Sequence, residues 1–126
     1  MPLSAFAELV VDQVATHCAS NANLIVTSFD ADALVEVRRQ RSDIATGLLF
    51  WRGSADAAIT RAVDDGHLAI APSIALLNER TVEKAVAADL AVMTWTVNEP
   101  ADVKLAASLG IAMIIGDDPR VIAANL

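Results

Sequence analysis

The regular spacing of short apolar runs is the feature that most constrains the fold of this chain. Strand-like runs begin near residues 24, 46, 68, 91 and 111, so one follows another about every 20 to 23 residues, with a helical pattern between them. Such alternation is typical of βαβ units, in which right-handed crossovers place the strands side by side and parallel. The sequence therefore predicts an α/β fold of about five parallel strands with flanking helices.

Turn and cap residues set the expected boundaries of these elements. Asp30 and Ser54 are placed to cap helices, and Gly66 is placed to end one in the left-handed conformation. An opening helix runs from Leu3 to Cys18 and is closed by a turn at residues 20–23. The expected strands are 24–28, 45–51, 67–71, 90–97 and 111–115, and the expected helices between and after them are 31–40, 54–65, 78–89, 100–109 and a short one from Asp118. No linker divides the chain, so residues 1–126 form one domain.

Composition and charge exclude several classes of function. The chain is 55% hydrophobic, above the usual share of about 45–50%, which fits parallel strands covered on both faces. Asp and Glu outnumber Lys and Arg 16 to 9, giving a net charge of −7, so nucleic acid and anionic membranes are not expected partners. Cys18 is the one cysteine, which excludes an internal disulfide and favours the cytoplasm. No run of 18 apolar residues or signal-peptide pattern is present, and no membrane span is expected.

Ligands of parallel α/β sheets bind at the carboxyl ends of the strands. The residues expected at that edge are Thr27, Ser28, Phe29, Trp51, Arg52, Pro72, Trp95 to Asn98, and Gly116 to Asp118. Few of them can exchange protons. His67 is expected at the opposite end of its strand and His17 near a helix end, so both are interpreted as structural or solvated.

Three motifs carry a family resemblance that covers essentially the whole chain. They are Ser28-Phe29-Asp30, then Trp95-Thr96-Val97-Asn98 followed by Glu99-Pro100, and a closing Ile114-Ile115-Gly116-Asp117-Asp118-Pro119. In this order they resemble the carboxyl-terminal part of glycerophosphodiester phosphodiesterases. The chain departs from that family at Asp89, where a glycine is usual, at Ala112, where Asp is usual, and at Gly116, where Thr is usual.

The resemblance implies a fold and a reaction. The family is built on a TIM (β/α)8 barrel, which needs about 250 residues, so these 126 residues are expected to form a partial barrel. The complete enzyme hydrolyses a glycerophosphodiester to glycerol 3-phosphate and an alcohol in glycerol and lipid metabolism, with a divalent metal, Mg or Ca. The family's His-Arg-Gly, its Glu/Asp metal pair, its second histidine and its Glu-x-Lys have no counterpart here, so we expect no catalytic residue and no bound metal in this chain.

What the resemblance assigns to this chain is a wall of the substrate site. Phe29 and Trp95 are expected to line the site, with Ser28 and Asn98 supporting the loops at its mouth. Each residue has a plainer interpretation as well. Trp95 alternates with Met93 and Val97 on one strand face, as a core residue does, and Asn98 is equally suited to shaping a turn.

Two functions of different class remain open. One is a phosphodiesterase that is catalytic only with an amino-terminal half, and the other is a non-catalytic partial barrel that serves as a binding or scaffold module. Because an open sheet has free edges and an uncovered face, either one predicts a homo-oligomer or association with a missing barrel half.

Overall fold

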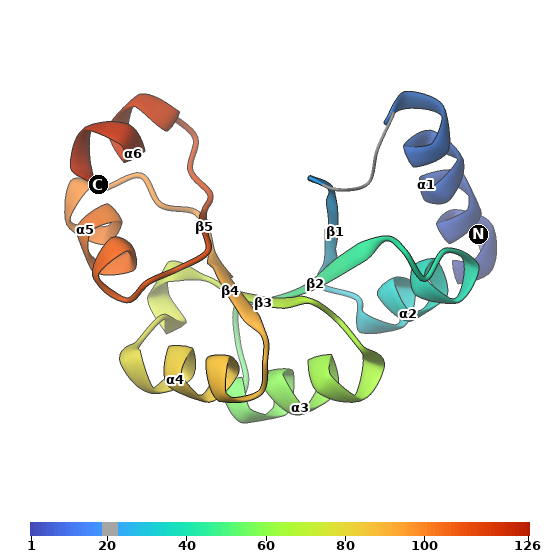
Figure 1. The fold of residues 1–126 in the computed structure, drawn as a ribbon, viewed down its shortest axis with the longest axis horizontal. Coiled ribbons are helices and arrows are strands. Elements are labelled where there is room, and N and C mark those ends of the chain that lie inside the picture. The colour runs from blue at the N-terminus through green and yellow to red at the C-terminus, as the bar shows by residue number, and fades with distance from the viewer. Residues whose placement is uncertain (19–22) are drawn as a thin grey trace.

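The computed structural model describes residues 1–18 and 23–126, which form an open, curved α/β half-barrel (Figure 1). In chain order its elements are α1 (Leu3–His17), β1 (Ile25–Ser28), α2 (Ala31–Gln40), β2 (Ala45–Phe50), α3 (Ala55–Asp65), β3 (Ala69–Pro72), the 3-10 helix η1 (Ile74–Leu76), α4 (Glu79–Ala87), β4 (Ala91–Thr94), α5 (Pro100–Ser108), β5 (Met113–Ile114) and α6 (Pro119–Asn125).

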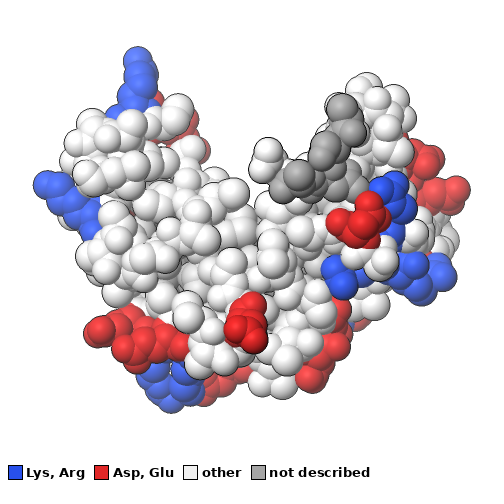
Figure 2. Space-filling view, viewed as in Figure 1, with Lys and Arg blue, Asp and Glu red and all other residues white. Residues whose placement is uncertain are grey.

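The sheet confirms the topology expected from the strand spacing. Within the described residues it has five strands in the order β1-β2-β3-β4-β5, and every neighbouring pair is parallel. The helices lie on its outer side, and the chain termini lie on opposite arms, which end in α1 and α6 (Figure 1). A hollow lies between the two arms (Figure 2). The fold is thus a partial (β/α) barrel, as predicted.

The outer face of the sheet holds the main core. Leu48, Ile70 and Val92 from the three central strands pack there against buried helix residues such as Leu34 and Ile59. A second cluster joins α1 to the body of the protein through Ala7, Val14, Val37 and Ile44. The amphipathic pattern of each helix is therefore explained by one buried face against the sheet or against α2.

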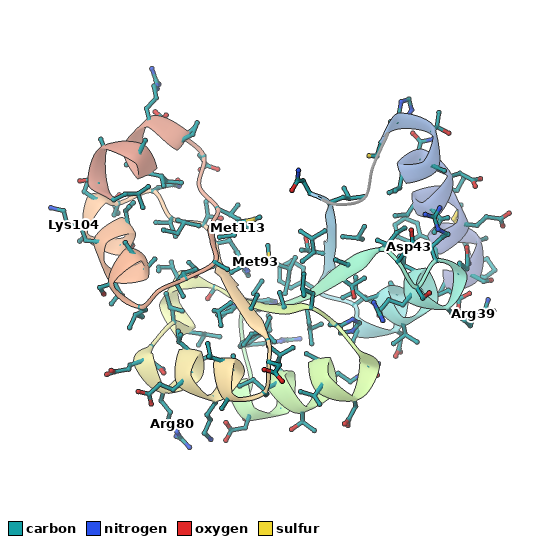
Figure 3. The ribbon with its side chains drawn as sticks, in the orientation of Figure 1. Arg39, Asp43, Arg80, Met93, Lys104 and Met113 are labelled. Carbon is teal, nitrogen blue, oxygen red and sulfur yellow. The ribbon has the colours of Figure 1, made fainter. Side chains whose placement is uncertain are left out.

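The inner face carries a smaller apolar cluster that no helix covers. Ala69, Ala71 and Met93 form its buried part, with Ile25 and Leu49 packed against them. Met93 and Met113 point into the hollow, whereas Arg39, Arg80 and Lys104 point away from it (Figure 3). Lys, Arg, Asp and Glu gather mainly over the outer side of the molecule (Figure 2).

The expected caps are present. The carboxylate of Asp30 accepts hydrogen bonds from the amides of Asp32 and Ala33, and Ser54 caps α3 through the amide of Ala57. Gly66 has φ +75 and ends α3 as predicted, and Asp89 has φ +60, the left-handed turn for which the family uses glycine. Of the turn expected at residues 20–23, residues 20–22 lie outside the described part of the chain.

Several strands are shorter than expected because loop contacts replace the ladder at their ends. The amide of His67 bonds to the carbonyl of Ala62 at 2.9 Å and so belongs to the end of α3, which moves β3 two residues along the chain. Beyond Thr94 the carbonyl of Trp95 accepts from the amide of Ile74 at 2.6 Å. The short helix η1 in this connection had no signal in the sequence. Among the helices of residues 1–18 and 23–126, none combines the length and the apolar character that crossing a bilayer requires.

Candidate functional site

The connections that follow the strands gather at one end of the half-barrel and form a surface that we name the carboxyl rim. It consists of residues 29–30, 51–54, 73–78, 95–99 and 115–118, each lying between the end of a strand and the start of the next helix. All four residues expected from the sequence to bind substrate lie at this rim or, for Ser28, on the last position of the strand below it.

An aromatic contact spans the concave side of the rim. The ring of Phe29, which follows β1, meets the ring of Trp95, which follows β4, with centroids 5.4 Å apart and planes at 89°. This edge-to-face arrangement is one that aromatic pairs favour. Residues from the first and fourth strands meet only because the sheet curves, so this contact reports the curvature directly.

Hydrogen bonds fix the indole of Trp95 in place. Its Nε1 donates to the carbonyl of Ala71 at 2.8 Å, which holds the ring over the end of β3. The backbone of Trp95 pairs with Ser73, and the peptide bond between Trp95 and Thr96 is cis. Trp95 belongs to the inner-face cluster with Ala71 and Met93, so it lies on the concave side, where the family resemblance placed it.

Ser28 and Asn98 serve the loops of the rim rather than meeting the aromatic pair through hydrogen bonds. The hydroxyl of Ser28 accepts from the amide of Asp30 at 3.0 Å, directly before α2. The amide nitrogen of the Asn98 side chain donates to the Asp117 carboxylate at 2.8 Å, and its oxygen accepts from the Asp117 backbone at 3.0 Å. Asn98 therefore ties the loop after β4 to the loop after β5.

Gly116 is needed where these two loops meet. A Cβ atom at this position would lie 2.2 Å from the carbonyl oxygen of Val97, a distance that real Cβ atoms do not show. The amide of Val97 also donates to the carbonyl of Ile115 at 2.8 Å. Gly116, where the family usually has threonine, therefore allows the backbone of this loop to lie close to the backbone of Val97.

The rim also holds Trp51 and Arg52, which the sequence placed at this edge without a role. The guanidinium carbon of Arg52 lies 4.8 Å from the ring centroid of Trp51, a cation–π geometry. Trp51 is 56% exposed and Phe29 is 55% exposed, so both present aromatic surface to solvent. In the sequence, the signal that could have pointed to this pair was an arginine directly after an aromatic residue at the end of a strand.

Three of the four carboxylates of the rim, those of Asp30, Asp117 and Asp118, are engaged in local structure. Asp118 caps α6 through the amide of Arg120, and its side chain pairs with the Arg120 guanidinium at 2.9 Å. That side-chain hydrogen bond, followed by the backbone one, lowers the pKa of Asp118. Within residues 1–18 and 23–126 no three His, Cys, Asp or Glu side chains converge as a metal site requires, so these residues do not fit the divalent ion of the family.

The main hollow lies away from the rim. A cavity of about 370 Å³ is bordered by residues at the starts of the strands, including Leu24, Ala45, Leu68, Ala91 and Ala112. Its lining is almost wholly apolar and contains no charged residue, so it has little to bind a polar ligand with. We therefore interpret it as part of the uncovered inner face, and the rim as the place where chemistry is possible.

His67 lies outside the rim and has a structural role. Its Nδ1 is 2.7 Å from the hydroxyl of Thr46, and its Nε2 is buried 3.6 Å from the Asp65 carboxylate without a hydrogen-bond partner. Burial lowers the pKa of His67, against the opposing effect of Asp65. Of the two interpretations given for His67, structural or solvated, its burial and its contact with Thr46 support the structural one.

Comparison with known proteins identifies the family. The model of the glycerophosphoryl diester phosphodiesterase family matches residues 5–121. Nothing among curated protein sequences matches the chain.

Solved structures share the fold. A protein described as a glycerophosphoryl diester phosphodiesterase from Silicibacter pomeroyi DSS-3 is 26% identical, with a TM-score of 0.84 over 97% of this chain and 45% of that one. An Oleispira antarctica phosphodiesterase, solved with the product sn-glycerol-3-phosphate, is 19% identical, with a TM-score of 0.88 over 98% of this chain and 49% of that one. The Thermotoga maritima glycerophosphodiester phosphodiesterase is 22% identical, with a TM-score of 0.71 over 96% and 52%.

The chain thus spans about half the length of the solved structures that it resembles. The family model covers nearly all of the 126 residues, and the half-barrel fold agrees with it. The chain belongs to the glycerophosphoryl diester phosphodiesterase family.

Proposed function

We propose that this chain supplies the substrate-wall half of a glycerophosphodiester phosphodiesterase. In this proposal a complementary half, in the same polypeptide or in another, completes the barrel and brings the catalytic groups. The joined halves hydrolyse a phosphoric diester to glycerol 3-phosphate and an alcohol, as part of glycerol and lipid metabolism. A reducing cytoplasm as its location, suggested by the single cysteine, remains part of the proposal.

The observation that carries this proposal is the Phe29–Trp95 contact at the carboxyl rim. Edge-to-face packing and the bond from Nε1 of Trp95 to Ala71 hold two aromatic surfaces on the concave side, where a ligand in the barrel would lie. Ser28 and Asn98 hold the adjoining loops through Asp30 and Asp117. Such a rigid apolar wall suits the carbon skeleton of a glycerol phosphate, and sn-glycerol-3-phosphate is the product bound by the Oleispira antarctica relative.

The number of strands favours a complementary half over a second copy. The described residues supply five strands, and a closed barrel of this type has about eight, so three are needed. Two copies of this chain would bring ten strands and a wider barrel, whose interior the same side chains would not fill. The exposed inner-face residues Met113 (45% exposed) and Leu68 (52% exposed) are the surface that such a half would cover.

The proposal assigns no bond-breaking step to this chain. The carboxylates of Asp30, Asp117 and Asp118 cap helices or bind a neighbouring side chain, and His67 is buried outside the rim. A divalent cation, Mg or Ca, and the acid and base that a phosphodiesterase needs would therefore be held by the complementary half. What the rim residues do is bind and orient the ligand.

A second candidate is a non-catalytic module that binds a ligand or a partner through the same surfaces. The feature that favours it is the shortage of free proton-exchanging groups at the rim. The two candidates predict the same association with a partner but differ in turnover, so one experiment separates them.

The test is a complementation assay. The chain is purified alone and also co-expressed with the amino-terminal half of the Silicibacter pomeroyi relative, and each sample is assayed with glycerophosphocholine in Mg²⁺ or Ca²⁺. We expect no turnover by the chain alone, a stable complex of the two halves, and release of glycerol 3-phosphate by the complex. Trp95→Ala should reduce turnover, whereas Leu105→Ala, on the outer side of α5, is the matched control and should not.

Each other outcome has a distinct meaning. Turnover by the chain alone would show that it contains catalytic groups and would overturn the division of roles. A complex without turnover would favour the binding module. Failure of the halves to associate, with both folded by circular dichroism, would refute the barrel-completion proposal.

A further inference from the structure

Arg52 is distinguished from the other basic residues by its position. Among the residues of the carboxyl rim, all of which the structure describes, it is the one Lys or Arg. The other basic side chains lie on helices or in connections at the opposite ends of the strands. Within the rim itself, Arg52 is therefore the cation available to a ligand that carries negative charge, whereas Arg80 and Lys84 of α4 border a small polar pocket with Ser54 and Asn78.

Arg52 also differs in its partners. Arg39, Arg41, Arg61, Arg80, Lys84 and Arg120 each pair with a carboxylate. The contact found for the Arg52 guanidinium among the described residues is instead the face of Trp51, 4.8 Å away. A guanidinium on an aromatic face keeps its edge, with its N–H donors, available to a planar or tetrahedral oxyanion.

The backbone brings this pair next to the aromatic wall. The amide of Ser73 bonds to the carbonyl of Phe50 at 2.9 Å, and Ser73 pairs with Trp95. Trp51 follows Phe50 directly. Ser73, the residue after β3, therefore lies between the backbone next to Trp51 and the backbone of Trp95. Arg52 therefore follows β2, which lies two positions from β4 in the sheet, at the same rim as the wall formed by Phe29 and Trp95.

We propose that Arg52, supported by Trp51, is the specificity-determining residue that binds an oxygen of the phosphoryl group of the ligand. The inference rests on the proposed function, since it assumes that a phosphate ester binds at the rim. Arg52 selects for the negative charge, and Phe29 and Trp95 contact the carbon part of the ligand. The role is binding and positioning, with no proton transfer, because a guanidinium stays protonated.

The two tryptophans of the chain make the proposal measurable. In a ¹⁵N-labelled sample their indole N–H groups give two signals, assigned with the Trp51→Phe and Trp95→Phe variants. The purified chain is titrated with sn-glycerol 3-phosphate and, separately, with glycerol as the uncharged match. We expect saturable shifts of the Trp51 signal with glycerol 3-phosphate and none with glycerol.

Substitution of Arg52 then tests its role. Arg52→Gln should raise the Kd for glycerol 3-phosphate about tenfold, as expected for loss of one charge-assisted hydrogen bond at an exposed site, and Arg52→Lys should lie between it and the wild type. Lys104→Gln removes the same charge from the outer side of α5, which points away from the hollow (Figure 3), and should leave the Kd unchanged.

The outcomes distinguish this inference from the proposed function. If the wild type binds glycerol 3-phosphate and Arg52→Gln binds it equally well, Arg52 has no such role while the substrate wall stands. If Lys104→Gln weakens binding as much as Arg52→Gln, the effect is one of net charge and the inference is wrong. If the folded wild type does not bind glycerol 3-phosphate at all, both the inference and the substrate-wall proposal fail.

Discussion

The contact between Phe29 and Trp95 should be measurable as a coupling free energy. The perturbation is a double-mutant cycle of Phe29→Leu, Trp95→Leu and the combined variant. Each leucine keeps apolar volume but removes a ring. Because the cycle subtracts the single-variant effects, it cancels the cost of losing the hydrogen bond from Trp95 to Ala71 and leaves the interaction of the two rings.

The structure sets the expected size of this coupling. Edge-to-face pairs contribute about 0.5–1.5 kcal/mol beyond their buried area. The rings are well placed at 5.4 Å and 89°, but Phe29 is 55% exposed, so water competes for one side of the contact. We therefore expect about 0.5–1 kcal/mol, in the lower half of the range.

The assay is urea unfolding followed by far-ultraviolet circular dichroism, which does not depend on the tryptophan that is replaced. Because association with another copy would add to the apparent stability, the free energies of unfolding are compared at several protein concentrations. The control is the cycle of Phe29→Leu with Trp51→Leu, since Trp51 makes its ring contact with Arg52 instead. A Phe29–Trp95 coupling below about 0.3 kcal/mol, no larger than that of the control, would refute the idea that sheet curvature brings the two rings into stabilising contact.

Three further predictions concern the supports of the rim and the buried histidine. Gly116→Ala should lower the free energy of unfolding in urea by about 2 kcal/mol or more, as at other overpacked sites. The reason is that its Cβ would lie 2.2 Å from the carbonyl oxygen of Val97. Asn98→Ala should cost about 1–2 kcal/mol through the loss of two hydrogen bonds to Asp117, and an Asp117→Ala background should remove only part of that difference, because the backbone amide of residue 117 still donates to Asn98. Burial lowers the pKa of His67 in the folded state, so the unfolded state takes up the proton first. The free energy of unfolding should therefore be highest above about pH 6.5 and should decrease as the pH falls below that value. In unfolding curves measured from pH 7.5 to 5, His67→Gln should make the free energy of unfolding less dependent on pH.

The sequence predicted the order of elements well because each boundary has a local cause. Asp30, Ser54 and Asn78 accept hydrogen bonds from the first-turn amides of the helices that follow them, and Gly66 adopts the left-handed conformation. These interactions involve residues two or three positions apart, so the local sequence is enough to predict them. Strand order followed from the right-handed crossover rule, which needs no knowledge of side chains.

The rim was less predictable because its contacts join distant segments. Phe29 and Trp95 are 66 positions apart and meet only through the curvature of the sheet. The bond between Asn98 and Asp117 depends on how two loops approach, and the fit of Gly116 against Val97 depends on the same approach. His67 was expected on a strand, but the hydrogen bond of its amide to Ala62 makes it part of the end of α3.

The two borders of the open sheet are chemically unequal, and this has a consequence for symmetry. Because all strands are parallel, β1 offers one kind of border and β5 the other, and the two-residue β5 presents fewer backbone groups than the four-residue β1. A copy that extended the sheet in the same parallel sense would have to place its β1 beside β5, a head-to-tail contact that leaves a new free border each time. Copies that add in this parallel sense would therefore form a polar series rather than a two-fold dimer.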